Sequence, residues 1–316
     1  ITAIQSNDEV PGRVAPLIIV STLLTHLCGG SAGREGAALQ VGGALGNTFA
    51  KLFKFDEKDT RIMIMCGMSA CFSALFGTPI ASAVFSMEVI SVGVMYYAAL
   101  VPCVLAAFIA QGIASALGLE STHFVVDEIA SFSFINGSKF IIMSVLFALA
   151  SILLCVVLKL YTDYINNPYI RIIIAGALVI AMRYIFGTTD YLGAGSDIIA
   201  RSFITSCAWY VFILKMLFTA VTLGGGFKGG EIVPTLFVGA TLVSFLAPIF
   251  GLPVGLTNCP LTSFILSIEM FGASTMKFTI LCIALSYLLS GYYSLYNSQK
   301  IIYSKYKTEY INRRSH

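Results

Sequence analysis

The sequence predicts an all-α, polytopic membrane protein built from two related helical halves of inverted topology. Three observations predict this fold class: the composition, a series of long apolar runs and an internal repeat. Of the 316 residues, 57% are hydrophobic and 11% are charged, and the mean hydropathy is +0.87. Soluble domains carry about 25% charged residues, so a soluble fold is excluded. The net charge of +3 is too small to indicate binding to nucleic acid.

Apolar runs supply the predicted helices. They cover residues 17–28, 62–76, 92–117, 140–160, 170–186, 207–223, 232–252 and 279–289. Several reach the roughly 20 residues that cross a bilayer as an α-helix, and others are short or interrupted by glycine and proline. The chain is therefore expected to cross the lipid bilayer several times.

Two pairs of segments form an internal repeat. Residues 33–45 (GREGAALQVGGAL) align with residues 230–242 (GEIVPTLFVGATL), and residues 79–88 (PIASAVFSME) align with residues 260–269 (PLTSFILSIE). The two matches occur in the same order, so the chain divides into related halves. We place the halves at residues 1–119 and 138–316, joined by a polar connector at residues 120–137.

Each half contains a glycine-rich element that comes directly before a predicted helix. Glycines there leave backbone amides accessible, and the positive end of the helix dipole lies at the same place. Irregular backbone at membrane depth is tolerated only where it lines a cavity. In transporters built from inverted repeats, such broken helices meet near the middle of the membrane with their N-termini directed at an anion. We expect an anion site where the two elements meet.

The second half is shorter than the first. Ala37 and Pro79 are 42 positions apart, whereas Pro234 and Pro260 are 26 positions apart. The difference is close to one helix, which residues 59–76 supply in the first half, and the deficit falls near residues 252–257. Because removing one spanning helix would invert everything after it, we expect these residues to be missing from this sequence rather than from the natural protein. We also expect the natural chain to begin before Ile1.

These motifs resemble the CLC family of chloride and fluoride channels and proton-coupled antiporters. Residues 33–36 (GREG) are similar to the family's GREGP element, with Ala37 in place of the proline. Residues 230–234 (GEIVP) are similar to its GxFxP element. Tyr303 falls where the family has a C-terminal tyrosine that touches the central anion. The resemblance extends from about Pro11 over nearly the whole chain.

The resemblance implies that Glu35 is a gate. A charged carboxylate would occupy the anion site, and a protonated one would leave and admit a halide, which links anion movement to proton movement. The alternative is an Arg34–Glu35 ion pair, although adjacent side chains on a helix do not face each other. Arg34 would either attract anions to the vestibule or hold loop carbonyls. Lys215 and Lys228 would act similarly or extend to an interface.

The resemblance also implies a set of anion-binding residues: Gly33, Arg34, Gly36, Ile232, Val233 and Tyr303. Glu231 departs from the chloride-type pattern, and Val89 stands where that type has a second glutamate. Together with Ala37, these departures resemble the fluoride-transporting branch. Glu231 is then either a second carboxylate in the proton route or a helix-end carboxylate that complements the dipole. Glu88 and Glu269 are expected to satisfy neighbouring helix ends.

The function expected from the resemblance is transport of chloride or fluoride in exchange for protons. One alternative is a passive voltage-gated-type chloride channel of the same family. A remote alternative is an intramembrane enzyme, which would rest on residues 193–197 (GAGSD). No histidine motif accompanies that segment, and it fits better as a loop that opens a short helix. The chain is therefore not expected to be an enzyme.

The remaining expectations concern partners and location. Eight cysteines are scattered through apolar segments without a CxxC motif, so we expect no metal and no cofactor. His26 is either a proton carrier or a buried histidine whose hydrogen bonds are satisfied. The basic residues of the segment 300–314 predict a cytoplasmic C-terminus by the positive-inside rule, and the alternative is a solvated tail with no orienting role. The family resemblance implies a homodimer, and we expect the plasma membrane as its location.

Overall fold

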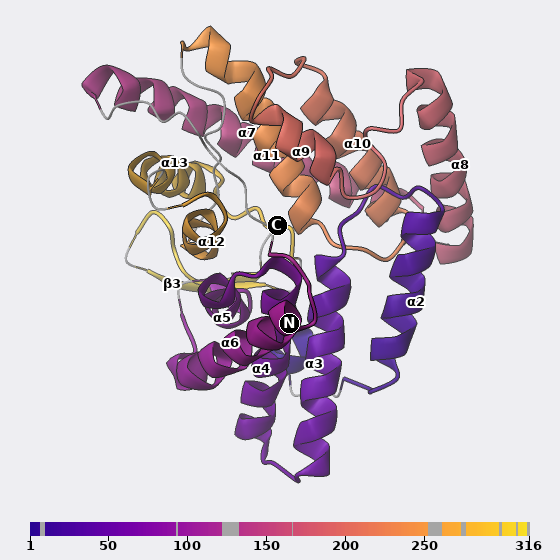
Figure 1. Ribbon diagram of the computed structural model, residues 1–316, viewed down its shortest axis with the longest axis vertical. Helices are drawn as coiled ribbons and strands as arrows, with labels where there is room; N and C mark the ends of the chain where they lie inside the picture. Colours follow the sequence, from indigo (N-terminus) through magenta and orange to yellow (C-terminus); the bar gives the residue numbers. More distant parts are fainter. Residues whose placement is uncertain are drawn as a thin grey trace.

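The computed structural model describes residues 1–6, 10–92, 94–121, 133–165, 167–251, 261–272, 276–296, 299–307 and 309–314. Within these ranges the chain is predominantly helical, as the sequence predicts (Figure 1). Five helices are long and apolar enough to cross a membrane: Glu57–Phe76, Tyr97–Ala116, Phe134–Lys159, Pro168–Phe186 and Ile232–Ile249. The protein is therefore a helical, multi-pass membrane protein.

The first half is formed by α1 (Thr2–Ser6), α2 (Val14–Leu27), α3 (Glu35–Leu52), α4 (Glu57–Phe76), α5 (Pro79–Glu88), the short 3-10 helix Tyr97–Ala99 and α6 (Leu100–Ala116). α3 and α4 lie side by side and join at the lower tip of Figure 1. α4 begins after Asp56, whose carboxylate accepts a hydrogen bond from the amide of Asp59 at 2.8 Å. It ends at Gly77, whose φ of 72° is in the left-handed region that glycine favours.

Glycines let α3 and α4 approach each other at the level of the backbone. A Cβ atom on Gly42 would overlap the carbonyl oxygen of Gly67, and one on Gly46 would overlap the carbonyl oxygen of Met63. Small residues at helix crossings are the usual means of close packing in membranes. Gly42 and Gly46 are therefore required by the α3–α4 contact.

The second half is formed by α7 (Phe134–Tyr164), α8 (Pro168–Phe186), α9 (Ser196–Ser202), α10 (Val211–Gly224), α11 (Ile232–Ile249), α12 (Leu261–Phe271) and α13 (Met276–Leu289). α7 begins at Phe134, four residues before the boundary predicted at residue 138, because the Ser133 side chain caps it by accepting from the amide of Asn136. Most of the predicted connector lies outside the described residues. α9 begins after Gly195, so residues 193–197 are a loop that opens a short helix.

A small sheet is the part of the fold that the sequence does not predict. β1 (Ser91–Val92) pairs in parallel with β2 (Lys300–Tyr303), which pairs antiparallel with β3 (Tyr310–Arg314). Strands of two to five residues are too short to show a sequence period. The sheet ties the C-terminal segment to the chain that follows α5.

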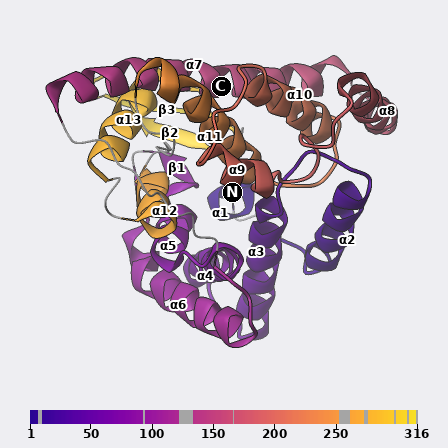
Figure 2. The same cartoon turned by 45° about the horizontal axis from the view of Figure 1, so that its top comes forward.

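The two halves face each other through repeat-related elements (Figure 2), with α5 packed against α12. The carboxylate of Glu269 on α12 accepts hydrogen bonds from the amides of Ile80 and Ala81 at 2.9 and 2.8 Å. These amides lie in the first turn of α5, so the predicted helix-end role of Glu269 is confirmed. The corresponding role of Glu88 stays a prediction.

Among the described residues the succession of helices differs between the halves, and residues 252–257, where the repeat spacing predicts the deficit, lie outside them. In the first half α3 is followed by α4 and then α5. In the second half α11 ends at Ile249 and α12 begins at Leu261, and the described residues contain no helix between them. α11 and α12 repeat α3 and α5, so α4 has no counterpart in the described part of the chain.

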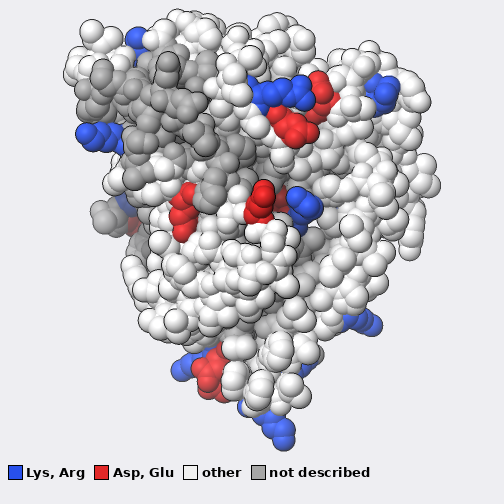
Figure 3. All heavy atoms as spheres, viewed as in Figure 1, with Lys and Arg blue, Asp and Glu red and all other residues white. Residues whose placement is uncertain are grey.

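The surface is dominated by uncharged residues. Figure 3 shows one face, on which charged groups lie at the lower tip, over the turn between α3 and α4, and also at mid-height and near the top. That turn contains the charged residues of the segment 51–61 (KLFKFDEKDTR). Charges at the end of a helical pair and an uncharged belt beside it are typical of a protein whose solvent is a bilayer.

Candidate functional site

α3 and α11 begin beside each other, as the repeat predicts. Gly33 and Gly230 form an antiparallel bridge in which the amide of each donates to the carbonyl of the other, at 2.8 and 2.9 Å. The bridge joins the two glycine-rich elements directly before their helices. It also uses the amide of Gly33, so this residue is a spacer rather than the amide donor to an anion that the sequence suggests.

The Glu35 side chain lies at this junction and is fully buried, with 0% of its surface exposed. Its Oε1 accepts a hydrogen bond from the amide of Val233 at 2.9 Å, and the amide of Ile232 interacts with the same carboxylate. Both amides belong to the first turn of α11, where backbone N–H groups have no intrahelical partner and the dipole is positive. The carboxylate therefore occupies the position in which a helix N-terminus holds an anion.

Glycines surround this carboxylate because nothing larger fits. A Cβ atom on Gly33 or on Gly230 would overlap the Glu35 carboxylate. A Cβ atom on Gly36 would overlap the carbonyl of Gly229 on the facing element. The glycines that the sequence marks are thus explained by the close approach of two backbones around one acid.

One oxygen of Glu35 remains unsatisfied. Oε2 is buried and has no hydrogen-bond partner among the described residues. A buried charge without partners is costly, whereas a proton on this oxygen would remove the charge. Movement of the side chain would then free the amides of Ile232 and Val233 for a different anion.

Arg34 lies in different surroundings from its neighbour. Its side chain is exposed while that of Glu35 is buried, and no ion pair joins these two described residues. The ion-pair alternative for Glu35 is therefore wrong in this structure. An exposed guanidinium next to the buried Glu35 in sequence is compatible with the predicted attraction of anions.

Lys215 of α10 brings a cation into the interior. It is fully buried, so the alternative of extension to an interface is wrong for this residue, while Lys228 is exposed. The Nζ of Lys215 donates to the carbonyl oxygens of Gly193 at 2.7 Å and Tyr191 at 3.2 Å, and it lies 5.0 Å from the ring centroid of Phe237.

Lys215 is also coupled to the segment that carries Glu35. The amide of Gly193 donates to the carbonyl of Gly30, in the loop between α2 and α3. The charge of Glu35 acts on the Lys215 ammonium as well. One buried cation therefore positions the loop and attracts the carboxylate.

Glu231 lies directly before α11, and its side chain accepts no capping hydrogen bond from the helix. Glu35 and Glu231 are close enough for the charge of one to act on the other. Both charges also act on Tyr296. The structure thus gathers two carboxyl groups and a phenol around the α11 N-terminus, and it gives Glu231 no hydrogen-bonding role as a cap.

The predicted role of Tyr303 is not supported by its position. Tyr303 lies on β2 with 49% of its surface exposed, and its ring packs edge-on against Tyr310 at 5.8 Å between centroids. Tyr296 is the tyrosine near the two carboxyl groups, and its ring meets the edge of Phe85 at 6.5 Å. Several tyrosines follow α13, so the sequence offered no signal that separates Tyr296 from the others.

His26 of α2 has one satisfied nitrogen. Its Nδ1 lies 2.9 Å from the carbonyl oxygen of Thr22, whereas Nε2 is buried without a partner among the described residues. The charge of a protonated His26 acts on Glu35. His26 is therefore a half-buried histidine with one partnered ring nitrogen, and the alternative of a buried histidine whose hydrogen bonds are all satisfied does not fit the described residues.

Comparison with known proteins adds an independent line of support. The family model described as "Voltage gated chloride channel" matches residues 1–291. A protein of Pseudomonas syringae pv. tomato named "Chloride/fluoride channel protein" is 34% identical, over 94% of this chain and 71% of that protein.

Solved structures agree in fold. The crystal structure of a CLC-type fluoride/proton antiporter superposes with a TM-score of 0.89 at 30% identity, covering 94% of this chain and 80% of that one. A slow cyanobacterial Cl⁻/H⁺ antiporter superposes with a TM-score of 0.75 at 21% identity, covering 88% and 72%. The second likeness shows the fold alone.

Proposed function

The chain belongs to the voltage gated chloride channel (CLC) family, and on this premise we propose that it exchanges a halide for protons with Glu35 as the gate. One observation carries the proposal: the buried carboxylate of Glu35 accepts the amide hydrogen of Val233 at the N-terminus of α11. A carboxylate and a halide compete for the same amides, so only one of them occupies the site.

Exchange follows from the chemistry of this competition. A charged Glu35 fills the site and excludes the halide, and a proton taken up by Glu35 weakens its hold on the amides. The halide then enters at the amides of Ile232 and Val233 and at those of α3 near Gly36, with Arg34 attracting anions from outside. Return of the carboxylate releases both the halide and the proton.

We propose fluoride as the preferred halide. Ala37 and Val89 replace the proline and the second glutamate of the chloride-type pattern, and Glu231 stands beside the site. The names of the Pseudomonas relative and of the 30% identical antiporter include fluoride. Fluoride is small and strongly hydrated, so its dehydration needs closely spaced N–H donors.

Location and assembly are part of the same proposal. The basic segment 300–314 supports a cytoplasmic C-terminus in the plasma membrane. A homodimer is expected from the family resemblance, and α6 has an exposed apolar stripe, formed by Leu105, Ile109 and Ile113, which is available to lipid or to a second copy. No chemical reaction is assigned to the protein.

Ion flux across liposomes tests the proposed function. With purified protein in liposomes and the membrane voltage clamped by potassium and valinomycin, an outward fluoride gradient is expected to drive protons inward against their own gradient. An equal chloride gradient is expected to drive fewer protons. Fluoride efflux without uphill proton movement would establish the passive channel instead, and absence of any halide flux would reject the proposal.

The exchange of Glu231 for glutamine tests the second carboxylate. If Glu231 passes protons to and from Glu35, then Glu231→Gln should lower fluoride-driven proton flux about 100-fold, the range of a positioned proton carrier. The proton flux is measured with a pH electrode outside the same liposomes. Glu309→Gln is the matched control, because Glu309 is exposed in the C-terminal segment. If Glu231→Gln keeps the wild-type proton flux, then Glu231 is only a charge that complements the helix dipole.

A further inference from the structure

An exchanger of halide for protons needs two proton routes to its gate, because a proton taken up from one side of the membrane is released to the other. Glu231, directly before α11, serves one of these routes at most. α2 packs against α3, which begins with Glu35, and α2 carries a further titratable side chain, that of His26. His26 is therefore the next group to compare with the needs of the gate.

The hydrogen bond of His26 fixes which of its ring nitrogens accepts a proton. Nδ1 lies 2.9 Å from the carbonyl oxygen of Thr22, one turn earlier on α2. A carbonyl oxygen only accepts hydrogen bonds, so Nδ1 carries a hydrogen, and in the neutral ring Nε2 keeps a lone pair. Nε2 is buried and has no hydrogen-bond partner among the described residues. His26 thus offers an unused base to its surroundings.

Three buried polar atoms without a partner in the described part of the chain belong to residues 22–35, where α2 ends and α3 begins. They are Oγ1 of Thr22, Nε2 of His26 and Oε2 of Glu35. Thr22 and His26 are four residues apart, so they share one face of α2. Buried polar atoms are nearly always hydrogen-bonded, and where the protein supplies no partner a water molecule usually does.

The loop between α2 and α3 is held in place on both sides. The amide of Gly30 donates to the carbonyl of Thr25 at 2.8 Å, which keeps the loop against the last turn of α2. The amide and the hydroxyl of Ser31 each lie 3.0 Å from a threonine hydroxyl of α10. This arrangement brings the end of α2 and the start of α3 together, and the charge of His26 acts on Glu35.

Other ionisable groups adjoin α2, which carries no second ionisable side chain of its own. Those at its ends, on α3, in the loop before α9 and on α10 are Arg13, Cys28, Arg34, Glu35, Lys51, Asp190, Tyr191 and Lys215. Except for Glu35, Tyr191 and Lys215, these residues are exposed. Lys215 donates to the carbonyl of Tyr191. Glu35 is the buried acid among them and is therefore the proton partner that His26 meets.

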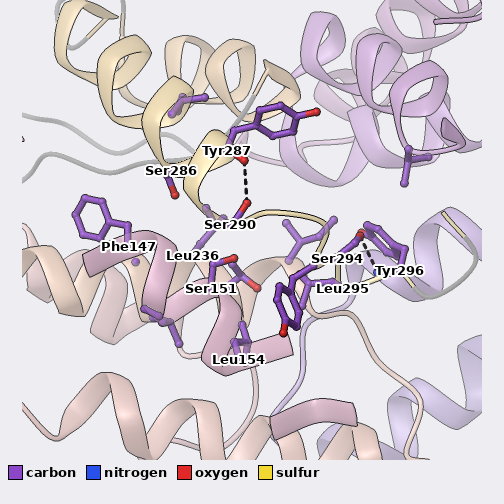
Figure 4. Close-up of a pocket in the computed structure, with 18 of the residues that line it drawn as sticks. Phe147, Ser151, Leu154, Leu236, Ser286, Tyr287, Ser290, Ser294, Leu295 and Tyr296 are labelled. Carbon is purple, nitrogen blue, oxygen red and sulfur yellow. Dashed lines mark hydrogen bonds between the residues drawn. The ribbon is translucent and has the colours of Figure 1, made fainter. Parts of the chain in front are cut away.

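His26 is not part of the cavity on the other side of the site. That cavity, drawn in Figure 4, is lined in part by Tyr296 and by Ile232 of α11, and by no residue of α2 or α3. A proton that reaches Glu35 through His26 therefore takes a route separate from this cavity.

We propose that His26 is a second proton relay of the exchanger and passes protons between its Nε2 and Oε2 of Glu35. This inference rests on the proposed exchange through Glu35. The imidazolium gives the proton on Nε2 to the carboxylate, directly or through a water molecule bound by Thr22, and the ring then takes its next proton from solvent. The transfer turns two charges into two neutral groups, which an apolar interior favours. His26 is half-buried, so its ring is not enclosed as Glu35 is.

Removal of the imidazole in two backgrounds separates a proton relay from a structural role. In voltage-clamped liposomes, His26→Ala should lower the coupled fluoride and proton fluxes together by about 100-fold, with their ratio unchanged, because Glu35 must still be protonated in every cycle. In the Glu35→Gln background fluoride moves without protons, so adding His26→Ala should leave fluoride efflux unchanged. If it slows fluoride efflux there by the same factor, then His26 supports the fold or the anion path, and the proposal is overturned.

Ser21→Ala is the matched control on the same helix. The Ser21 hydroxyl donates to the carbonyl of Leu17 at 2.7 Å, so it has a partner within α2. This variant should keep the wild-type fluxes in both backgrounds. Slowed exchange in Ser21→Ala, equal to that in His26→Ala, would show that any change in α2 has this effect and would overturn the proposal.

Imidazole in the liposome buffer tests the chemistry of the relay. His26→Ala leaves a ring-sized space at a half-buried position, where a free imidazole can carry the proton instead. Coupled flux in His26→Ala is expected to rise with imidazole concentration and to vary with the pKa of the imidazole used, as general acid–base catalysis does. Flux that no imidazole raises would overturn the proton-transfer role.

Failure of this inference differs from failure of the proposed function. Wild-type exchange in His26→Ala, together with uncoupled fluoride efflux in Glu35→Gln, would overturn the relay and leave Glu35 as the gate. Absence of uphill proton movement in the unmodified protein would reject the exchange and the relay with it. A thermal melt identifies a His26→Ala protein that fails to fold. His26→Gln, which keeps a donor for the Thr22 carbonyl, then replaces it.

Discussion

Replacing Glu35 by glutamine (Glu35→Gln) is expected to reduce proton flux about 100-fold or to background, the range expected for loss of a positioned proton carrier. Glutamine has the shape of the protonated acid and still accepts the amide hydrogen of Val233 through its oxygen. It does not titrate, so anion movement no longer requires a proton. Fluoride efflux and external pH are recorded together in voltage-clamped liposomes at two pH values.

The Glu35 result needs a control for loss of a carboxyl group as such. Glu120→Gln removes an exposed carboxylate beyond the end of α6, and it is expected to leave coupling unchanged. If Glu35→Gln retains proton flux with the wild-type pH dependence, then Glu35 is not the gate. The family membership would stand, but the proposed mechanism would not.

Removal of the buried cation should have the second large effect. Lys215→Met leaves the carbonyl oxygens of Tyr191 and Gly193 without their shared donor. Each buried unsatisfied group costs about 1–3 kcal/mol, so the free energy of unfolding should fall by about 2 kcal/mol or more. Thermal unfolding in detergent, followed by intrinsic fluorescence, measures this loss.

The electrostatic role of Lys215 has its own signature. A nearby cation favours the ionised form of Glu35, so Lys215→Met makes the carboxylate hold its proton to higher pH. The midpoint of proton-coupled flux against pH should therefore rise. Lys228→Met removes an exposed cation and should change neither stability nor midpoint. If Lys215→Met is destabilised but the pH midpoint of its proton-coupled flux is unchanged, then Lys215 only holds the loop at Gly193.

Much of the site could be predicted because the repeat marks it. The segments GREG and GEIVP lie 197 positions apart, yet their shared pattern predicts that they meet, and Gly33 and Gly230 do form a bridge. A buried acid among glycines in an apolar chain is itself informative, since membranes tolerate few charges without a function. Glu269 could be predicted in the same way, from its repeat counterpart Glu88.

Other site residues could not be predicted, because their roles depend on contacts between segments that are far apart in the sequence. In the sequence Lys215 resembles any lysine near a helix end. Its role depends on the packing of α10, which brings its Nζ to the carbonyl oxygen of Gly193. Tyr296 is one of several tyrosines after α13, and the loop that positions it has no period. The amide of Gly33 could not be predicted to donate to the carbonyl of Gly230, because this hydrogen bond joins two segments that are far apart in the sequence.

The sequence by itself determined that this is a multi-pass helical membrane protein with two related halves and with a carboxyl group at Glu35. These properties are local: hydropathy, glycine content and repeat spacing are present in the chain before it folds. Only the tertiary structure decided which amides Glu35 meets and which cation faces it. Those are distances between segments far apart in the chain, and packing of whole helices sets them.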